Sequence, residues 1–364
     1  MNDDALEKLR ARIDAIDGKL LELFNQRARC AVDVAEVKRA LSDGGDEGLN
    51  FFRPDREAQV IKRLKSLNRG PLSDDEVGRL IREVMSACLA LEQPLKIAYL
   101  GPEGTFTQSA ALKHFGHSVS TIPMSSIPDV FSSVESGHAD YGLVPVENST
   151  EGVISHTLDM FIDSNLKVCG EVEIPIHHHL ANKTQDMSNV RHIYSHQQSF
   201  AQCRRWLNQN CPGIERIPVS SNAEAARLAS EEDDAAAICG LPAVEIFELE
   251  ICYENIEDLS DNTTRFVIIG DQDVDASGND KTSLLISTKN VPGALLGLLQ
   301  PLADHGISMN KIESRPAQGR KWAYVFFIDI DGHQQDEAVI QALAELKQQA
   351  SLFKILGSYP KASL

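Results

Sequence analysis

The N-terminal stretch constrains the fold most strongly, because it predicts one helix too long for a compact domain to cover. From Asp4 to about Leu41 no proline interrupts the chain. Apolar residues recur there at helical spacing, namely Leu6, Leu9, Ile13, Ile16, Leu20, Leu23, Val34 and Val37. At 1.5 Å per residue such a helix is roughly 57 Å long. We therefore expect a partner chain or a long bundle to cover its apolar face.

Two shorter helices are predicted after a polar, glycine-rich turn at residues 42–48. One begins at Pro54, which suits the first helical position, and runs to about Leu67. The other begins at Ser73, where a capping box with Glu76 is expected, and ends before Pro94. The first part of the chain is therefore expected to be all-helical.

After Pro94 short β-type runs alternate with helical segments, which predicts an α/β arrangement. The expected strands are KIAYL, YGLVPV, KVCGEVEI, HIYS, AAAICG and RFVIIG. Residues 97–115 and 193–207 share the order strand, polar turn, helix. Two similar lobes that face a cleft would explain this similarity.

A polar linker at residues 271–280 separates this part from the C-terminal part. The segments beyond it predict strand, helix, strand, strand, helix and strand, and they are TSLLISTKN, GALLGLLQPLADHG, SMNKIESRP, WAYVFFIDI, DEAVIQALAELKQQ and FKILGSYP. This βαββαβ order is the ferredoxin-like pattern.

Composition excludes several classes of function. The net charge of −18 and a pI near 5.0 argue against a nucleic-acid partner and against an anionic membrane surface. The seven cysteines are scattered without a CxxC pair, so neither a disulfide framework nor a zinc ribbon is expected. We expect a cytoplasmic protein, because the sequence has no apolar run of membrane-spanning length and no export signal. The acidic excess lies in residues 94–275.

Basic residues of the long helix fall into two groups around its axis. Arg27 and Lys38 are 11 positions apart and so lie within about 20° of one another, whereas Arg10 is roughly 100° away from Arg27. A second copy of the helix, packed in a dimer, could supply Arg10 to the same site. For each residue taken alone, a solvated surface position is the alternative.

The segments LRARIDAIDGKLLELFNQRARCAVDVAEVK, PDREAQV and MSACLALEQ resemble the all-helical class of chorismate mutase over residues 5–93. That family forms intertwined dimers of three-helix chains and rearranges chorismate to prephenate by positioning and electrostatic stabilisation. The resemblance implies that Arg27 and Arg10 of a second copy bind carboxylates, Lys38 reaches the ether oxygen, Arg56 supports substrate binding and Glu57 accepts from the ring hydroxyl.

This chain departs from the family pattern near the expected site. Glu92 stands where some members have a glutamine that donates to the ether oxygen. A carboxyl group donates only when it is protonated, so the site needs a raised Glu92 pKa or an acidic pH. Cys88 replaces a serine and is left out of the site. The loop at residues 39–52 is longer than in some relatives and Arg53 replaces an acidic residue, so the resemblance leaves the lid of the site open.

Hydroxyl and amide residues cluster at strand ends, in the segments GPEGTFTQ, VPVENSTEG, SHQQSFAQC and DNTTRFVIIG. Ligands of open α/β sheets bind at such ends, and a helix that begins at Thr105 would attract an anion. Helix caps and turn formers are the alternative interpretation of these residues.

Taken together, the four segments resemble prephenate dehydratase over residues 96–270. The reaction expels a carboxylate as CO₂ and the ring hydroxyl as water. The resemblance implies catalytic or substrate contacts for Asn148, Ser195, Gln202 and Thr264, a motif completed by Arg265 and Phe266, and cleft positions for Thr105, Glu147 and His178. We expect the Thr264 hydroxyl to donate to the leaving oxygen.

The run His177 to His179 suggests a metal site only superficially. Side chains alternate between the faces of a strand, so three successive histidines cannot converge on one ion. We expect a packed His178 beside an exposed neighbour, no metal and no cofactor.

The turn Gly293-Ala294-Leu295 and the strand end Glu313-Ser314-Arg315-Pro316 resemble the ACT domain of prephenate dehydratases, over about residues 281–360. The resemblance implies an L-phenylalanine site between paired ACT domains, with Asn310 among its residues, and feedback inhibition of the dehydratase.

We therefore predict three domains: an all-α mutase domain at residues 1–93, a two-lobed α/β dehydratase domain at 96–270 and a ferredoxin-like ACT domain at 281–364. Chorismate, prephenate and L-phenylalanine are the expected ligands, and a homodimer or homotetramer the expected assembly. Two alternatives stay open, a non-catalytic amino-acid sensor and a monofunctional dehydratase whose helices only dimerise.

Overall fold

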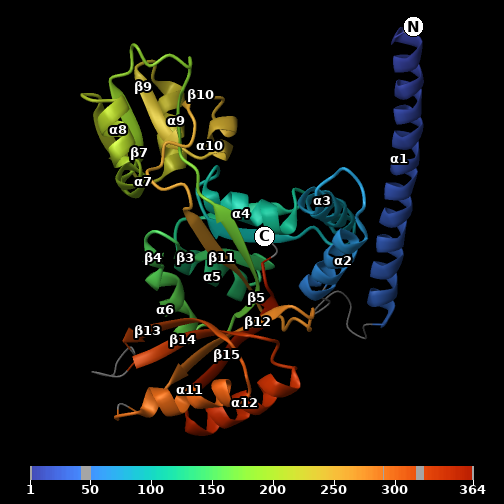
Figure 1. The fold of residues 1–364 in the computed structure, drawn as a ribbon, viewed down its shortest axis with the longest axis vertical. Coiled ribbons are helices and arrows are strands. Elements are labelled where there is room, and N and C mark those ends of the chain that lie inside the picture. Colours follow the sequence, from blue (N-terminus) through green and yellow to red (C-terminus); the bar gives the residue numbers. More distant parts are fainter. Residues whose placement is uncertain (1, 42–50, 290, 317–323, 363–364) are drawn as a thin grey trace. The chain divides into compact units, whose positions relative to one another are not determined.

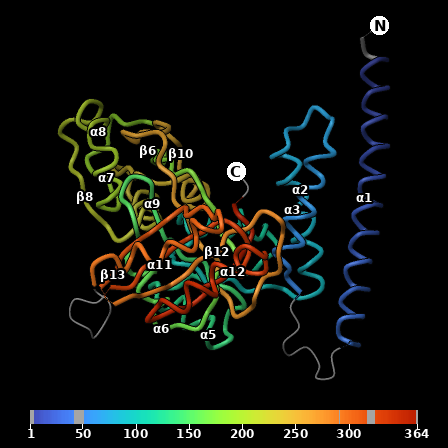
Figure 2. Tube along the Cα trace, turned by 60° about the horizontal axis from the view of Figure 1, so that its bottom comes forward, coloured from blue at the N-terminus to red at the C-terminus, as the bar shows by residue number. Residues whose placement is uncertain are grey.

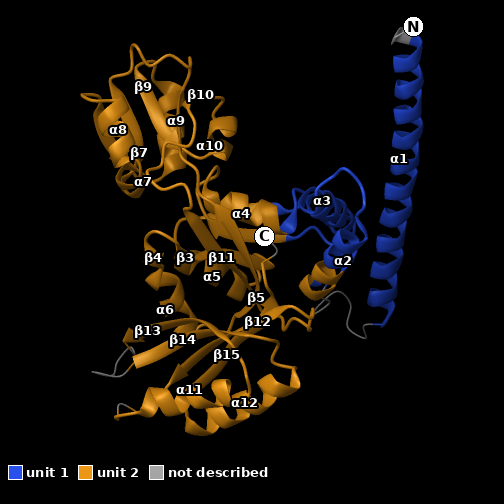
Figure 3. Ribbon diagram, viewed as in Figure 1, with its two compact units in different colours: residues 1–53, 60–95, 115–120 blue, residues 54–59, 96–114, 121–364 orange. Residues whose placement is uncertain are grey.

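The computed structural model describes residues 2–41, 51–289, 291–316 and 324–362 (Figures 1 and 2). The predicted turn at residues 42–48 and the first two residues of WAYVFFIDI lie outside these ranges. The chain divides into two compact units: residues 1–53, 60–95 and 115–120, and residues 54–59, 96–114 and 121–364 (Figure 3). None of the helices in the described part of the chain combines the length and apolar character that a membrane span requires.

The long first helix is confirmed, because α1 runs without interruption over Asn2–Leu41. The eight apolar residues that predicted it are 43–58% exposed in this single chain. The other two helices are α2 (Pro54–Leu67) and α3 (Asp74–Glu92). Ser73 caps α3 by accepting from the Glu76 backbone N–H at 3.2 Å. An apolar stripe left this open in one chain favours helix-to-helix association.

The first lobe of the second unit is a mixed sheet, in the order β2 (Ser120–Met124), β1 (Lys96–Leu100), β3 (Tyr141–Asn148), β11 (Thr263–Gly270) and β5 (Lys167–Pro175). The short strand β4 (Gly152–Val153) pairs with β3. The helices α4 (Phe106–Phe115), α5 (Ile127–Glu135) and α6 (Ser155–Asp163) belong to this lobe. In this sheet β1 is parallel to β3, and β11 is antiparallel to both its neighbours.

The second lobe is a five-stranded sheet in the order β10 (Glu250–Tyr253), β6 (His179–Asn182), β9 (Ala235–Cys239), β7 (His192–His196) and β8 (Glu215–Val219). Its helices are α7 (Gln197–Gln202), α8 (Arg204–Asn210), α9 (Asn222–Glu231) and α10 (Leu241–Ile246). All six predicted strands are confirmed across the two lobes. The sequence did not predict β2, β4, β6, β8 and β10.

The C-terminal part confirms the βαββαβ order, with β12 (Asp280–Ser287), α11 (Ala294–Asp304), β13 (Met309–Pro316), β14 (Tyr324–Asp331), α12 (Glu337–Gln349) and β15 (Leu352–Pro360). Its antiparallel sheet has the order β13-β14-β12-β15. Phe327, Leu356 and Tyr359 of this sheet share one buried core with Phe161 and Val168 of the first lobe. The C-terminal sheet is therefore packed against the first lobe and is not joined to it by the linker alone.

Candidate active and effector sites

A cavity of about 280 Å³ lies between the two lobes and confirms the expected cleft. Of the residues that the sequence predicted as dehydratase site residues, six line it: Thr105, Asn148, His178, Gln202, Thr264 and Phe266. Its lining among the described residues includes no lysine or arginine. A dianionic ligand in this cavity would therefore depend on hydrogen-bond donors and helix dipoles.

Two helices of ten residues begin at the cavity wall. Thr105 directly precedes α4, and Ser221 caps α9 by accepting from the Glu224 backbone N–H at 3.0 Å. Asn222, the first residue of α9, lines the cavity as well. The N-terminal end of a helix carries partial positive charge and unpaired N–H groups, so both ends favour an anion in the cavity.

Ser195 lies just behind the cavity wall. It is fully buried, and its hydroxyl lies 3.1 Å from Asn222 Oδ1 and 3.3 Å from the carbonyl oxygen of Ile238. The Asn222 Nδ2 donates in turn to Ser199 Oγ at 2.8 Å. In this structure Ser195 orients a residue of the cavity wall and does not itself line the cavity.

Thr264 and Asn148 are paired across neighbouring strands on the cavity side. They are register partners in β11 and β3, and Asn148 Nδ2 donates to Thr264 Oγ1 at 2.8 Å. Asn148 Oδ1 accepts from the backbone N–H groups of Thr150 and Glu151, both at 3.1 Å. Because those donors are backbone groups, they fix which end of the Asn148 amide faces Thr264.

His178 is buried, as expected, with 1% exposure, and its neighbour His179 is buried too, with 9%. Its Nε2 lies 2.8 Å from Gln202 Oε1, and burial lowers its pKa, so the ring is neutral. The strand argument for the three histidines was wrong in part, because only His179 belongs to β6. His177 is bound to Glu257 at 2.7 Å. No group of three metal-ligating side chains occurs among the described residues.

Arg265 and Glu147 lie away from the cavity, although the resemblance implied substrate contacts for both. Successive strand residues point to opposite faces, so Arg265 cannot share the face of Thr264 and Phe266. Its Nη2 lies 2.6 Å from Asp329 Oδ2 in β14, and its Nε lies 3.1 Å from Glu171 Oε2. Glu147 binds Lys311 of β13 at 2.8 Å. Both side chains thus connect the first lobe to the C-terminal sheet.

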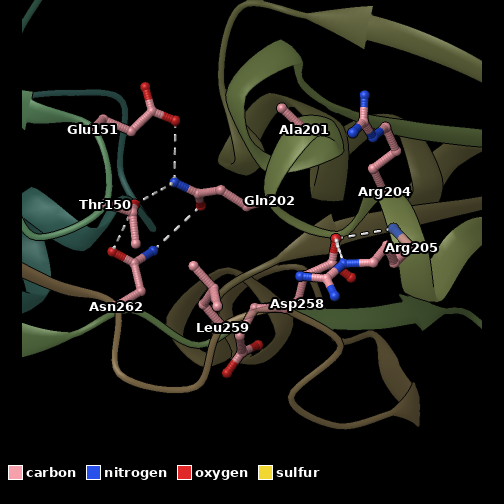
Figure 4. Close-up of a pocket in the computed structure, with 10 residues that line it drawn as sticks. Thr150, Glu151, Ala201, Gln202, Arg204, Arg205, Asp258, Leu259 and Asn262 are labelled. Carbon is pink, nitrogen blue, oxygen red and sulfur yellow. Dashed lines mark hydrogen bonds and ion pairs between the residues drawn. The ribbon is translucent and has the colours of Figure 1, made fainter.

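A second cavity of about 450 Å³ shares Gln202 and Asn262 with the first (Figure 4). In Figure 4 the Gln202 amide nitrogen faces Glu151 and Thr150, and its oxygen faces Asn262. Sequence analysis missed Asn262, which is 2% exposed. Its place two residues before Thr264, in a polar strand end, was the available signal.

In the helical unit, the charges of the predicted residues Lys38 and Arg27 act on the predicted residue Glu92. Glu92 is half-buried, and burial raises its pKa against the opposing charges of Lys38, Arg27 and Arg39. Lys38 Nζ lies 5.1 Å from the centre of the Phe51 ring. Arg27 donates to the Val84 carbonyl at 3.4 Å.

The other predicted mutase residues, Arg10, Arg56 and Glu57, lie on α1 and α2. Arg10 is exposed on α1. Arg56 and Glu57 occur in the first turn of α2, in the segment 54–59 that belongs to the other compact unit. Cys88 is buried.

The expected effector residues lie at a turn and on an edge strand. Gly293 has φ of +80°, which glycine adopts without strain, directly before Ala294 and Leu295 of α11. On β13 the side chains of Asn310, Ser314 and Pro316 are exposed, and Glu313 is partly covered.

Arg315 is held by the first lobe. It binds both Asp159 carboxylate oxygens, at 2.9 and 3.0 Å from Nη2, and donates to Ser155 Oγ at 2.8 Å. Both partners belong to α6. The predicted effector strand is therefore tied directly to the lobe that carries Thr264.

Comparison with known proteins gives three family matches in chain order: chorismate mutase type II over residues 9–93, prephenate dehydratase over 97–274 and the ACT domain over 282–348. A bifunctional chorismate mutase/prephenate dehydratase of Pseudomonas aeruginosa is 53% identical, with all of both chains covered. One of Escherichia coli K12 is 30% identical over all of this chain and 98% of its own.

A solved structure gives the same assignment for the last two parts. The prephenate dehydratase of Arthrobacter aurescens in complex with L-Phe is 34% identical, with a TM-score of 0.68 over 74% of this chain and 90% of its own. These matches do not favour a non-catalytic sensor or a purely structural helical domain. The chain therefore belongs to the family of bifunctional chorismate mutase/prephenate dehydratases that carry an ACT domain.

Proposed function

We propose a division of labour among the residues of this bifunctional enzyme of phenylalanine biosynthesis, with domains at 1–93, 96–270 and 281–364. The helical domain converts chorismate to prephenate, and the two-lobed domain converts prephenate to phenylpyruvate. L-Phenylalanine binds the ACT domain and inhibits. We place the enzyme in the cytoplasm.

In the mutase site Arg27 and Arg10 of a second copy bind the substrate carboxylates, so the functional unit is a homodimer or a homotetramer. Lys38 and protonated Glu92 donate to the ether oxygen, where negative charge grows as the bond breaks. The raised Glu92 pKa supports this role, because it keeps the donor proton on the carboxyl group at higher pH. Arg56 and Glu57 complete the substrate contacts.

In the dehydratase site the Thr264 hydroxyl donates a hydrogen bond to the departing ring hydroxyl, which takes up a proton from solvent and leaves as water. Asn148 already donates to the Thr264 oxygen. Thr264 therefore acts as the donor toward the substrate, since no acceptor in the described part of the chain takes its hydrogen. The N-terminal ends of α4 and α9 receive carboxylate, and the absence of lysine and arginine from the described lining keeps the group to be lost as CO₂ free of a strong counter-ion.

The observation that carries the dehydratase proposal is the Asn148–Thr264 pair in the inter-lobe cavity. To test it, purified Thr264→Ala is given chorismate, and prephenate and phenylpyruvate are followed separately with and without L-phenylalanine. We expect phenylpyruvate formation to be lost and prephenate formation to continue. Thr263→Ala is the matched control, because that neighbouring side chain points to the other face of β11. Equal loss of both activities in Thr264→Ala would contradict the proposal.

A further inference from the structure

Asn262 links the proposed catalytic pair Asn148–Thr264 to the polar pair Gln202–His178, of which His178 is buried and Gln202 partly buried. It is 2% exposed and lines both cavities. Its Oδ1 accepts from Asn148 Nδ2 at 2.8 Å, and its Nδ2 donates to Gln202 Oε1 at 3.3 Å. Gln202 in turn contacts His178. Asn262 thus connects Asn148 to Gln202 through its amide, and the Thr150 hydroxyl, 2.7 Å from Asn148 Oδ1 and 3.4 Å from Gln202 Nε2, makes a second connection.

The donor and the acceptor of every hydrogen bond in this network follow from the backbone N–H groups at one end of it. The N–H groups of Thr150 and Glu151 can only donate, so the Asn148 atom that they contact is oxygen. The other end of the Asn148 amide therefore donates its two hydrogens, one to Thr264 Oγ1 and one to Asn262. The Asn262 atom that accepts must be oxygen, which turns its NH₂ group toward Gln202.

The same reasoning extends into the second lobe. Since Asn262 donates to Gln202, the Gln202 atom that it contacts is oxygen, and His178 must carry its hydrogen on Nε2. A neutral His178 fits this, because burial lowers its pKa. The Gln202 NH₂ group then points toward Thr150 and Glu151, at 3.4 and 3.3 Å. In this network, each donor atom from Asn148 to His178 therefore faces an acceptor.

We propose that Asn262 is a positioning residue of the dehydratase. Together with the backbone N–H groups of Thr150 and Glu151, it holds the Asn148 amide in the orientation that occupies the Thr264 oxygen, so that the Thr264 hydrogen points to substrate. It also ties this orientation to Gln202 of the other lobe, so the donor is aligned when the two lobes stand around the ligand. The proposal rests on the donor role of Thr264 stated above.

The decisive variant is Asn262→Asp, which keeps the acceptor for Asn148 but loses the donor for Gln202. At neutral pH the introduced carboxylate faces the Gln202 oxygen, so the hydrogen bond between residues 262 and 202 is lost and the others are kept. Protonation at lower pH restores a donor. We expect dehydratase kcat to fall on the order of 10- to 100-fold, with a smaller change in KM, and to recover as the pH is lowered. Asn262→Ala has neither group and recovers at no pH.

Other titratable or charged groups line the two cavities around this position, namely Glu151, His178, His196, Arg204, Arg205, Glu257 and Asp258. They are present in the wild type too, so the ratio of variant to wild-type kcat at each pH isolates the introduced carboxyl group. The matched control is Asn210→Asp on exposed α8, which we expect to keep the wild-type profile. Mutase turnover of each variant reports on the helical unit, and the calorimetric transition of the larger unit reports whether the two-lobed domain is folded.

The outcomes separate this inference from the proposed function. Acid recovery of Asn262→Asp, without recovery of Asn262→Ala and with normal mutase turnover, supports it. Wild-type kcat in both variants, equal pH profiles for both, or loss of mutase turnover together with dehydratase turnover overturns it. If Thr264→Ala keeps dehydratase activity, the donor role itself fails. If only the Asn262 variants behave as wild type, Thr264 keeps its role and Asn262 loses its own.

Discussion

Replacing Arg265 by methionine tests whether the buried charges between the first lobe and the C-terminal sheet stabilise the protein as a group. The Arg265 side chain is 13% exposed, and its partners Asp329 and Glu171 are 9% and 2% exposed. Methionine keeps much of the apolar volume and removes the charge. Glu171 retains Lys281, which binds it at 2.7 and 2.9 Å. Asp329 keeps only the hydroxyl of Ser283 among its described polar side-chain partners.

The expected loss in the free energy of unfolding of Arg265→Met follows from the carboxylates that remain buried without it. Removing one partner of a buried ion pair costs about 3–5 kcal/mol, because the other charge is left uncompensated. Since Glu171 retains its lysine, we expect the lower end, about 3 kcal/mol. For a unit of this size that corresponds to a melting temperature lower by about 6–12 °C. An exposed pair contributes only about 0–1 kcal/mol.

Differential scanning calorimetry of the full chain measures the shift, with the transition of the helical unit as an internal reference. Arg227→Met is the matched control, because Arg227 also binds two carboxylates, Glu224 at 2.8 Å and Glu231 at 2.6 Å, but with 41% of its side chain exposed. Adding Asp329→Asn to Arg265→Met should restore part of the loss, since it removes the stranded charge. A shift no larger than that of Arg227→Met, or no recovery in the double variant, would refute the reasoning.

Three further predictions concern the mutase site, the assembly and the effector response. Glu92 acts as a donor only when protonated and its pKa is raised by burial, so mutase kcat should fall as the pH rises through that pKa; Glu92→Gln should flatten the profile, and an unchanged profile would remove Glu92 from the mechanism. Ile13→Asp places a charge on the exposed apolar stripe of α1 and should dissociate the dimer in sedimentation experiments, with loss of mutase but not dehydratase turnover; a variant that stays dimeric would show that the stripe is not the interface. Asp159→Asn removes the ion pair with the Arg315 guanidinium. The L-phenylalanine concentration for half-inhibition should then shift by at least about fivefold. An unchanged inhibition curve would show that this contact does not couple the two sites.

The elements that the sequence predicted are those whose signal is local. The apolar period of α1 is visible in the residues from Leu6 to Val37, and the six predicted strands are apolar enough to be predicted from their own residues. The missed strands lack such a signal: β2 and β8 contain prolines at 123 and 218, and β6 is only four residues long. They form because another strand pairs with each of them: β1 with β2, β7 with β8, and β9 and β10 with β6. That pairing is not visible in the local pattern of residues.

Site residues, like strands, could be predicted where the signal is local and were missed where it depends on distant residues. A motif read as a unit suggested that Thr264, Arg265 and Phe266 all serve the substrate. The period of two in a strand already implies that the middle residue faces the other way, and the structure places it there. Asn262 could not have been ranked above its polar neighbours, because its importance lies in two hydrogen bonds to residues 60 and 114 positions away.

The acidic excess of the middle part of the chain now has a partial physical explanation. Residues 94–275 contain 27 acidic and 10 basic residues, which is unexpected for a domain that binds a dianion. Three of its carboxylates bind cations of the C-terminal sheet, in the pairs Glu171–Lys281, Glu147–Lys311 and Asp159–Arg315. These charges therefore face the effector domain and not the cavity. Because Arg265 and Glu147 are paired on β11 and β3 next to Thr264 and Asn148, a displacement of the C-terminal sheet would act on strands that carry the proposed donor.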